Sequence, residues 1–180
     1  MRLNKLTISV FTFTFIFINN VFGNIVINEL QYNPLHSTGS YDDSAEFIEL
    51  YNNSPDTIDL AGWSIVEDND EDANDSGFVY EIDTIFTFPT GTSIPSHGYL
   101  VTARDSSEFF TIHGKYVDFH GGWVGNLSNG GENIMLQNAS GVWVDSVDWE
   151  DNSGGWSDVA DGDGPSLELK DSQSDNNLAA

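Results

Sequence analysis

The sequence contains no cysteine, and this absence removes several classes of protein from consideration. A disulfide framework, the usual support of small exported domains, is excluded. Thiol nucleophiles, redox motifs and zinc sites built on thiolates are excluded with it. The hydrophobic core, alone or with bound ions, must therefore supply the stability of the fold.

Basic residues are almost as scarce as cysteine. The 180 residues include five Lys and Arg against 29 Asp and Glu, which gives a formal net charge of −24. Such a surface repels phosphate backbones and anionic membranes, so we expect no nucleic-acid partner. It attracts cations, and it leaves most carboxylates without a basic side chain to pair with.

The first 23 residues have the organisation of a secretory signal peptide. Arg2 and Lys5 form a positive n-region, the apolar stretch LTISVFTFTFIFI follows, and VFG precedes a break after Gly23. The apolar stretch is short for a membrane span, although an uncleaved N-terminal anchor is the alternative interpretation. We therefore expect a secreted or cell-surface protein whose mature chain is one domain at residues 24–180, without a membrane span. Loss of the two basic residues changes the formal charge from −24 to −26.

No helical periodicity follows the signal peptide. Short segments rich in Val, Ile, Tyr, Phe and Trp recur between clusters of Gly, Asn, Asp, Ser and Pro. This pattern is typical of an antiparallel sandwich or barrel, so the fold class is predicted to be all-β. Strands are expected at residues 25–31, 45–52, 60–66, 78–88, 97–103, 132–138, 142–149 and 165–170.

Two connections carry recognisable local signals. Residues 138–141 separate two apolar runs, which predicts a tight hairpin in which Gly141 takes a positive φ. The stretch DSSEFFTIHG predicts one short helical segment. Asp105 or Ser106 would be its N-cap, and Gly114 would mark its exit.

The segment SAEFIELYNNS places two glutamates inside a run that otherwise predicts a buried strand. Alternation puts Glu46 on one face with Ile48 and Leu50, and Glu49 on the opposite face. An unpaired carboxylate is costly to bury. Each must therefore be hydrogen-bonded, ion-paired, metal-bound or protonated.

Glu29 and Asp161 raise the same question, because they lie in the motifs INEL and DGDG. Backbone N–H groups, hydroxyls or an indole N–H are the first candidate partners of these carboxylates. The shortage of basic residues motivates a sharper hypothesis, a Ca²⁺ site formed by Glu29, Glu46 and Asp161. A paired-carboxylate glycosidase is the catalytic interpretation. No second motif supports it, so no catalytic residue and no enzymatic activity are predicted.

The tryptophans divide into two groups. Trp63 and Trp143 lie inside strand patterns and are predicted to be core residues. Trp123 and Trp156 are flanked by glycine in GGWVG and GGWSD, which favours exposed rings that stack on a sugar or anchor a protein. The alternative is that these two rings close the ends of the sandwich.

Six segments are distinctive when they are read in order: IVINELQYNP, SAEFIELYNNS, IDLAGWSIVED, FPTGTSIPSHGYLVTA, LSNGGENIMLQNASGVWVDSVDW and ADGDGPSLELKD. Together they resemble the lamin tail domain family, the module at the end of nuclear lamins that also occurs in exported bacterial proteins. The resemblance covers about residues 25–175. It implies an immunoglobulin-like antiparallel β-sandwich with Greek-key connections. It also implies that Glu29 and Glu46 are signature positions of a non-catalytic module.

The residues and the resemblance together predict an exported, acidic interaction module or spacer. Its partners would be other domains of the same polypeptide, an extracellular protein or a glycan. The scarcity of basic residues argues against the chromatin contacts of nuclear relatives. A carbohydrate-binding module that uses Trp123 and Trp156 is one alternative. An accessory domain of an extracellular hydrolase is another, because bacterial relatives continue into further domains and this chain would then be the N-terminal module.

Overall fold

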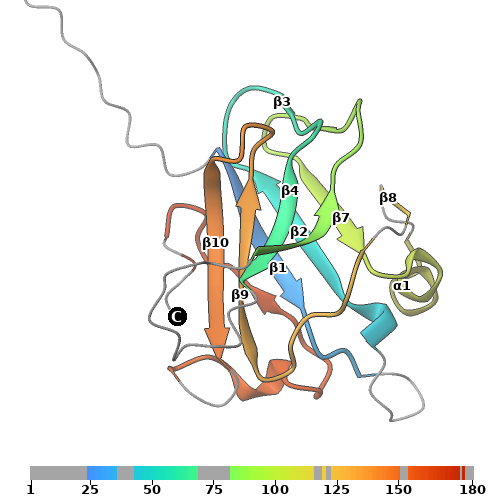
Figure 1. The fold of residues 1–180 in the computed structure, drawn as a ribbon. Coiled ribbons are helices and arrows are strands. Elements are labelled where there is room, and N and C mark those ends of the chain that lie inside the picture. Colours follow the sequence, from blue (N-terminus) through green and yellow to red (C-terminus); the bar gives the residue numbers. More distant parts are fainter. Residues whose placement is uncertain are drawn as a thin grey trace, which may run out of the picture.

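Strands dominate the part of the chain that the computed structural model describes, which is residues 24–35, 43–68, 82–115, 119–120, 123–150, 154–174 and 176 (Figure 1). The strands are β1 (Ile25–Gln31), β2 (Phe47–Asn52), β3 (Ile58–Asp59), β4 (Ser64–Asp68), β5 (Ile82–Thr87), β6 (Ser93–Ile94), β7 (Tyr99–Ala103), β8 (Phe119–His120), β9 (Gly131–Gln137), β10 (Trp143–Glu150) and β11 (Leu167–Glu168). One helix, α1 (Ser106–His113), and two 3-10 turns, Asp43–Ala45 and Asp158–Ala160, complete the elements. The prediction of an all-β fold is confirmed.

Two main sheets form the sandwich. One has the strand order β11-β1-β2-β7-β8, the other has the order β10-β9-β4-β5, and β3 pairs separately with β6. The chain changes sheet several times, since β2 and β7 lie in the first sheet while β4 and β9 lie in the second. Neighbouring strands run antiparallel in the described pairings, apart from β8, which is parallel to β7.

The core lies between the inward faces of these sheets, and in strands such as β9 buried apolar residues alternate with less buried ones. Ile48 and Leu50 from β2 are completely buried, as are Ile134 and Leu136 from β9. Other large side chains that are fully buried are Trp149, Tyr32, Phe88, Leu60 and Leu127. One continuous cluster therefore joins the two sheets.

Helix α1 packs on the outer side of the first sheet. Asp105 is its N-cap, because its Oδ1 accepts the N–H groups of Ser107 and Glu108 at 2.8 and 3.1 Å. Gly114 ends the helix in the left-handed conformation with φ 67°. Phe109 attaches the helix to Phe47, with ring centroids 5.4 Å apart. The sequence prediction for this segment is confirmed.

Several predicted strand limits need correction. The strand expected at 60–66 begins only at Ser64, as β4, because a turn in which Gly62 has φ 77° precedes it; the short strand β3 ends at Asp59, before the expected range. The strand expected at 97–103 begins at Tyr99, because His97 has a positive φ of 54°. The strand expected at 165–170 shrinks to β11. Residues 78–81 of another expected strand lie outside the described residues.

The signal peptide predicted at residues 1–23 also lies outside the described residues. None of the helices in the described ranges has the length and apolar character needed to cross a membrane.

Candidate functional site

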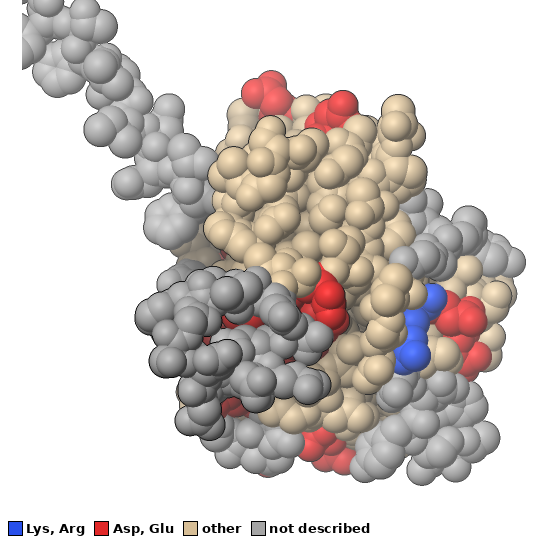
Figure 2. Space-filling model, viewed as in Figure 1, with Lys and Arg blue, Asp and Glu red and all other residues tan. Residues whose placement is uncertain are grey.

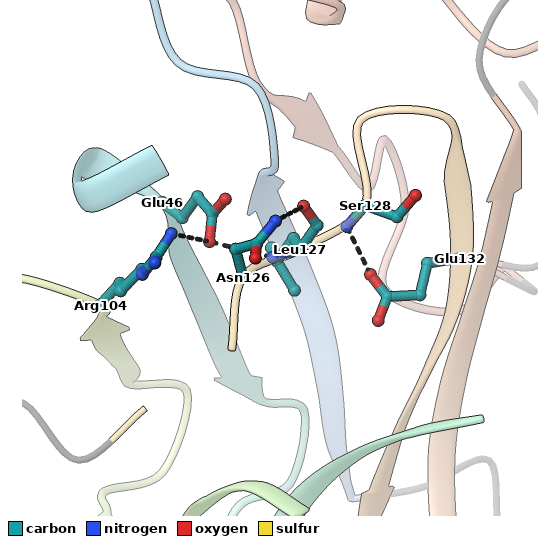
Figure 3. A network of polar contacts seen from close by, with 6 residues as sticks. All are labelled: Glu46, Arg104, Asn126, Leu127, Ser128 and Glu132. Atoms are coloured by element: carbon teal, nitrogen blue, oxygen red, sulfur yellow. Dashed lines mark hydrogen bonds and ion pairs between the residues drawn. The ribbon is translucent and has the colours of Figure 1, made fainter. Parts of the chain in front are cut away.

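Glu46 is completely buried at the point where β2 begins. Its Oε2 accepts the backbone N–H of Leu127 at 3.0 Å and lies 3.8 Å from Nη1 of Arg104 (Figure 3). The Arg104 side chain is 31% exposed, and its own backbone N–H donates to the carbonyl oxygen of Glu46 at 3.0 Å. The carboxylate therefore holds the 127–128 segment, which leads into the second sheet, against the first sheet.

Glu132 is a second inward-facing acid, and it binds the same 127–128 segment. Its Oε2 accepts the backbone N–H of Ser128 at 2.7 Å (Figure 3). Burial, followed by a hydrogen bond with Glu67 and the like charges of Glu67 and Glu46, raises the pKa of Glu132 to about 9. The Ser128 N–H opposes this shift. Glu132 is therefore protonated at neutral pH.

Glu132→Gln is expected to stabilise the protein near pH 8.5 more than near pH 5.5. Because the pKa of Glu132 is about 9 in the folded protein and its ordinary value is 4.5, the stability that Glu132 contributes is fully present below about pH 4.5. It is lost as the pH rises toward 9, since unfolding then releases a proton. Glutamine stays neutral throughout. Urea denaturation of both proteins at several pH values would measure this, and a difference that does not change with pH would contradict the raised pKa.

A row of three carboxylates crosses the outer face of the first sheet. Glu168, Glu29 and Glu49 are direct neighbours on β11, β1 and β2. The Ser166 hydroxyl donates to Glu29, and Nδ2 of Asn28 donates to Oε1 of Glu49 at 2.8 Å. Burial raises the pKa of Glu49, and the like charges of Glu29 and Glu168 add to this effect. Neutral donors thus provide hydrogen bonds to two of these three carboxylates, those of Glu29 and Glu49.

Asp161 lies beside Asn33, and its hydrogen-bond partner differs from those of Glu46 and Glu29. Its Oδ1 accepts Nδ2 of Asn33 at 2.6 Å, and the two residues form a parallel bridge. The structure therefore does not bring Glu29, Glu46 and Asp161 together, and each has a hydrogen-bond donor from the protein. Within the described ranges, no group of three or more His, Asp or Glu side chains is placed to hold a metal ion. Calcium binding stays a prediction.

The tryptophans predicted to bind ligand are both partly buried. Trp123 packs against the core, and its Nε1 donates to the hydroxyl of Thr102 at 3.0 Å. Trp156 also packs against the core cluster. The ring of Trp143, predicted to be a core residue, is instead 49% exposed. Trp63 packs against the core, as predicted.

Trp156 and Glu29 line one pocket, so the structure brings together two residues that the sequence analysis assigned to different sites. The pocket has a volume of about 480 Å³ and lies where β1 and β11 approach β10. Its apolar wall includes Val147 and Leu167, and its polar lining includes Asn28, Ser157, Ser166, Lys170 and Asn176. It can hold a small amphipathic ligand.

Three polar residues with structural roles were missed by the sequence analysis: Arg104, Glu132 and Asp145. Oδ2 of Asp145 accepts the Ile27 N–H at 2.6 Å and Nδ2 of Asn176 at 2.8 Å, which links β10 to β1. Asp145 follows an irregularity in the β9–β10 pairing. For Asp145, the only signal in the sequence was an acid at an inward position of a predicted strand. Both of its hydrogen-bond partners lie more than thirty residues away along the chain.

A protein-family model matches most of the chain. The model of the family described as Lamin Tail Domain matches residues 19–151. This range contains β1 through β10, whereas β11, Trp156 and Asp161 lie beyond it. No protein in the curated collection matches the chain.

Proposed function

The chain belongs to the Lamin Tail Domain family, and from this premise we propose that it works outside the cell as a module that binds a protein or a cell-surface polymer. The family consists of immunoglobulin-like, non-catalytic domains, which gives the general class of the protein. Export, the binding role and the nature of the partner are the proposal. A rigid sandwich suits such a role because it presents loops and sheet faces without rearrangement.

One observation carries the proposal, namely that the inward-facing carboxylates are used to connect the two sheets. Glu46 binds the 127–128 segment, and Asp145 binds the backbone of β1. Such acids contribute to the fold, because each accepts a backbone N–H from a segment that belongs to or leads into the other sheet. The exposed aromatic side chains, Trp143 and Tyr99 among them, are then the surface groups best suited to a partner.

Carbohydrate binding at the Trp156 pocket is the second candidate function. The observation that favours it is the combination of an indole ring with amide, hydroxyl and charged side chains around a single pocket. Aromatic rings stack on the apolar faces of sugars while polar groups bind the hydroxyls.

The export proposal predicts a mature chain that begins at Asn24. When residues 1–180 are produced in a Gram-negative host, the protein recovered outside the cytoplasm should have this N-terminus by intact-mass measurement. Residues 24–180 produced alone should stay in the cytoplasm, which provides the matched control. The binding role is tested separately, because purified mature protein should sediment with washed cell envelopes if it binds a surface component. Full-length protein that retains residues 1–23 in the cytoplasm would contradict export.

A further inference from the structure

The outer face of the second sheet carries a row of four uncharged side chains, here called the neutral row. It consists of Trp143 on β10, Gln137 on β9, Ser64 on β4 and Thr87 on β5, and each is the direct cross-strand neighbour of the next. The hydroxyls of Ser64 and Thr87 are 3.1 Å apart and hydrogen-bonded. Half of the Trp143 side chain is exposed at the edge strand.

The neighbouring row is uncharged as well. It contains Ser146, Met135, Val66 and Thr84, again paired across the four strands. An acid appears only in the row after it, where Asp148 is opposite Asn133. Figure 2 shows the corresponding effect, because the upper part of the side on which β10, β9 and β4 lie is mainly tan, with red atoms at its upper rim and lower down.

Two adjacent uncharged rows are unusual for this chain, in which 29 acids oppose five basic residues. The neutral row offers no carboxylate to a basic peptide and no cation to a phosphate, sulfate or uronic acid. It does offer an indole ring, an amide and two hydroxyls. An aromatic face with neutral hydrogen-bond donors and acceptors beside it matches a sugar ring, which has apolar C–H faces and hydroxyl edges.

The row also has a suitable shape for a polymer. Four strands at the usual spacing span about 14 Å, so the row is longer than one sugar ring and runs perpendicular to the strands. All four members of the row are at least partly exposed, and none of them lines the pocket that Trp156 lines. A face of this kind can contact several successive rings of an extended chain.

We propose that the neutral row binds an uncharged polysaccharide, with Trp143 stacking on one sugar ring and Gln137, Ser64 and Thr87 hydrogen-bonding to its neighbours. The proposal rests on the proposed function and specifies the chemical class of the partner. Trp143 is the main contact, because aromatic stacking supplies more affinity than one exposed hydrogen bond.

The test is affinity electrophoresis of residues 24–180 in native gels that contain a soluble β-glucan, xylan, mannan or starch. At least one of these polymers should retard the protein. Trp143→Ala should weaken the retarding affinity by about tenfold or more, which corresponds to ~1.4 kcal/mol. Trp143→Phe should lose less, and Gln137→Ala should lose a smaller amount in the same polymer. Ile112→Ala, an exposed residue on α1 at the other sheet, should bind as the unchanged protein does. Trp156→Ala is measured beside it to detect binding at the separate pocket.

Melting curves of the variants establish that each is folded, and Trp143→Ala should melt close to the unchanged protein because its ring is half exposed. Four outcomes would overturn the proposal: no retardation by any of the four polymers, equal binding by Trp143→Ala, loss of binding only in Trp156→Ala, or a concentration-dependent dimer that Trp143→Ala dissociates. None of these outcomes affects the export experiment, so failure of the neutral row and failure of the proposed function are distinguishable.

Discussion

Glu46→Ala is expected to lower the free energy of unfolding by about 3 kcal/mol, because it breaks a buried charge pair and removes the acceptor of a buried N–H. The Leu127 N–H would lose its partner, and Arg104 would lose the carboxylate 3.8 Å away. For a domain of this size the melting temperature should fall by roughly 10 °C. Chemical denaturation monitored by tryptophan fluorescence would measure the loss.

Two further variants separate the causes of this loss. Glu46→Gln retains an oxygen that can accept the Leu127 N–H, so it should lose less stability than Glu46→Ala. Glu168→Ala removes an exposed glutamate and should change stability by less than about 0.5 kcal/mol. Equal stability of Glu46→Ala and Glu168→Ala would mean that the buried carboxylate does not hold the 127–128 segment.

Gly131→Ala is expected to destabilise the protein by about 3 kcal/mol or more. Gly131 begins β9 with φ 110°, a conformation that residues with a side chain rarely adopt. A Cβ there would lie 2.6 Å from the carbonyl oxygen of Trp149 and 2.9 Å from Cα of Glu150. Both atoms belong to the backbone of β10, so the strand itself would have to move.

The adjacent glycine provides the matched control. At Gly130 the nearest atom to an added Cβ is the hydroxyl oxygen of Ser128 at 3.9 Å, and φ is not in the left-handed region. Gly130→Ala should therefore fold with nearly unchanged stability. Denaturation curves of the two variants should differ clearly, and similar curves would show that the close approach of β9 and β10 does not require Gly131.

Local signals in the sequence predicted those parts of the fold that depend on local chemistry. Asp105 caps α1, and Gly114 ends it, because a short acidic side chain and a residue tolerant of positive φ are needed there. The hairpin at 138–141 forms for the same kind of reason, with Gly141 at φ 73°. Alternation in β2 placed Ile48 and Leu50 on one face, and both residues are buried in the core.

The position of Trp143 was predicted wrongly because of an irregularity in strand pairing. Trp143 has the same parity as Val147 and Trp149, which are buried, so simple alternation places all three on the inward face. The register of β10 shifts between Trp143 and Asp145, and the extra residue turns Trp143 to the outer face beside Gln137. A single sequence does not show where such an extra residue lies.

The candidate sites depended on contacts between distant segments, and sequence spacing could not supply these. Alternation placed Glu46 on the same face as Ile48 and Leu50, yet its hydrogen-bond partner Leu127 is 81 residues away. Likewise, Glu29 and Trp156 meet at one pocket only because β11 returns to pair with β1. The residue types were recognisable, whereas their grouping required the topology.

The central claim is that buried carboxylates stabilise this sandwich through hydrogen-bond donors of the protein itself. The most direct test measures how much stability Glu46→Ala loses, once in chelator and once in excess calcium. We expect the same loss of about 3 kcal/mol in both conditions, since Leu127 and Arg104 bind the carboxylate without an ion. A loss that appears only in calcium would contradict the account, because ligand binding to the folded state would then be the source of the stability.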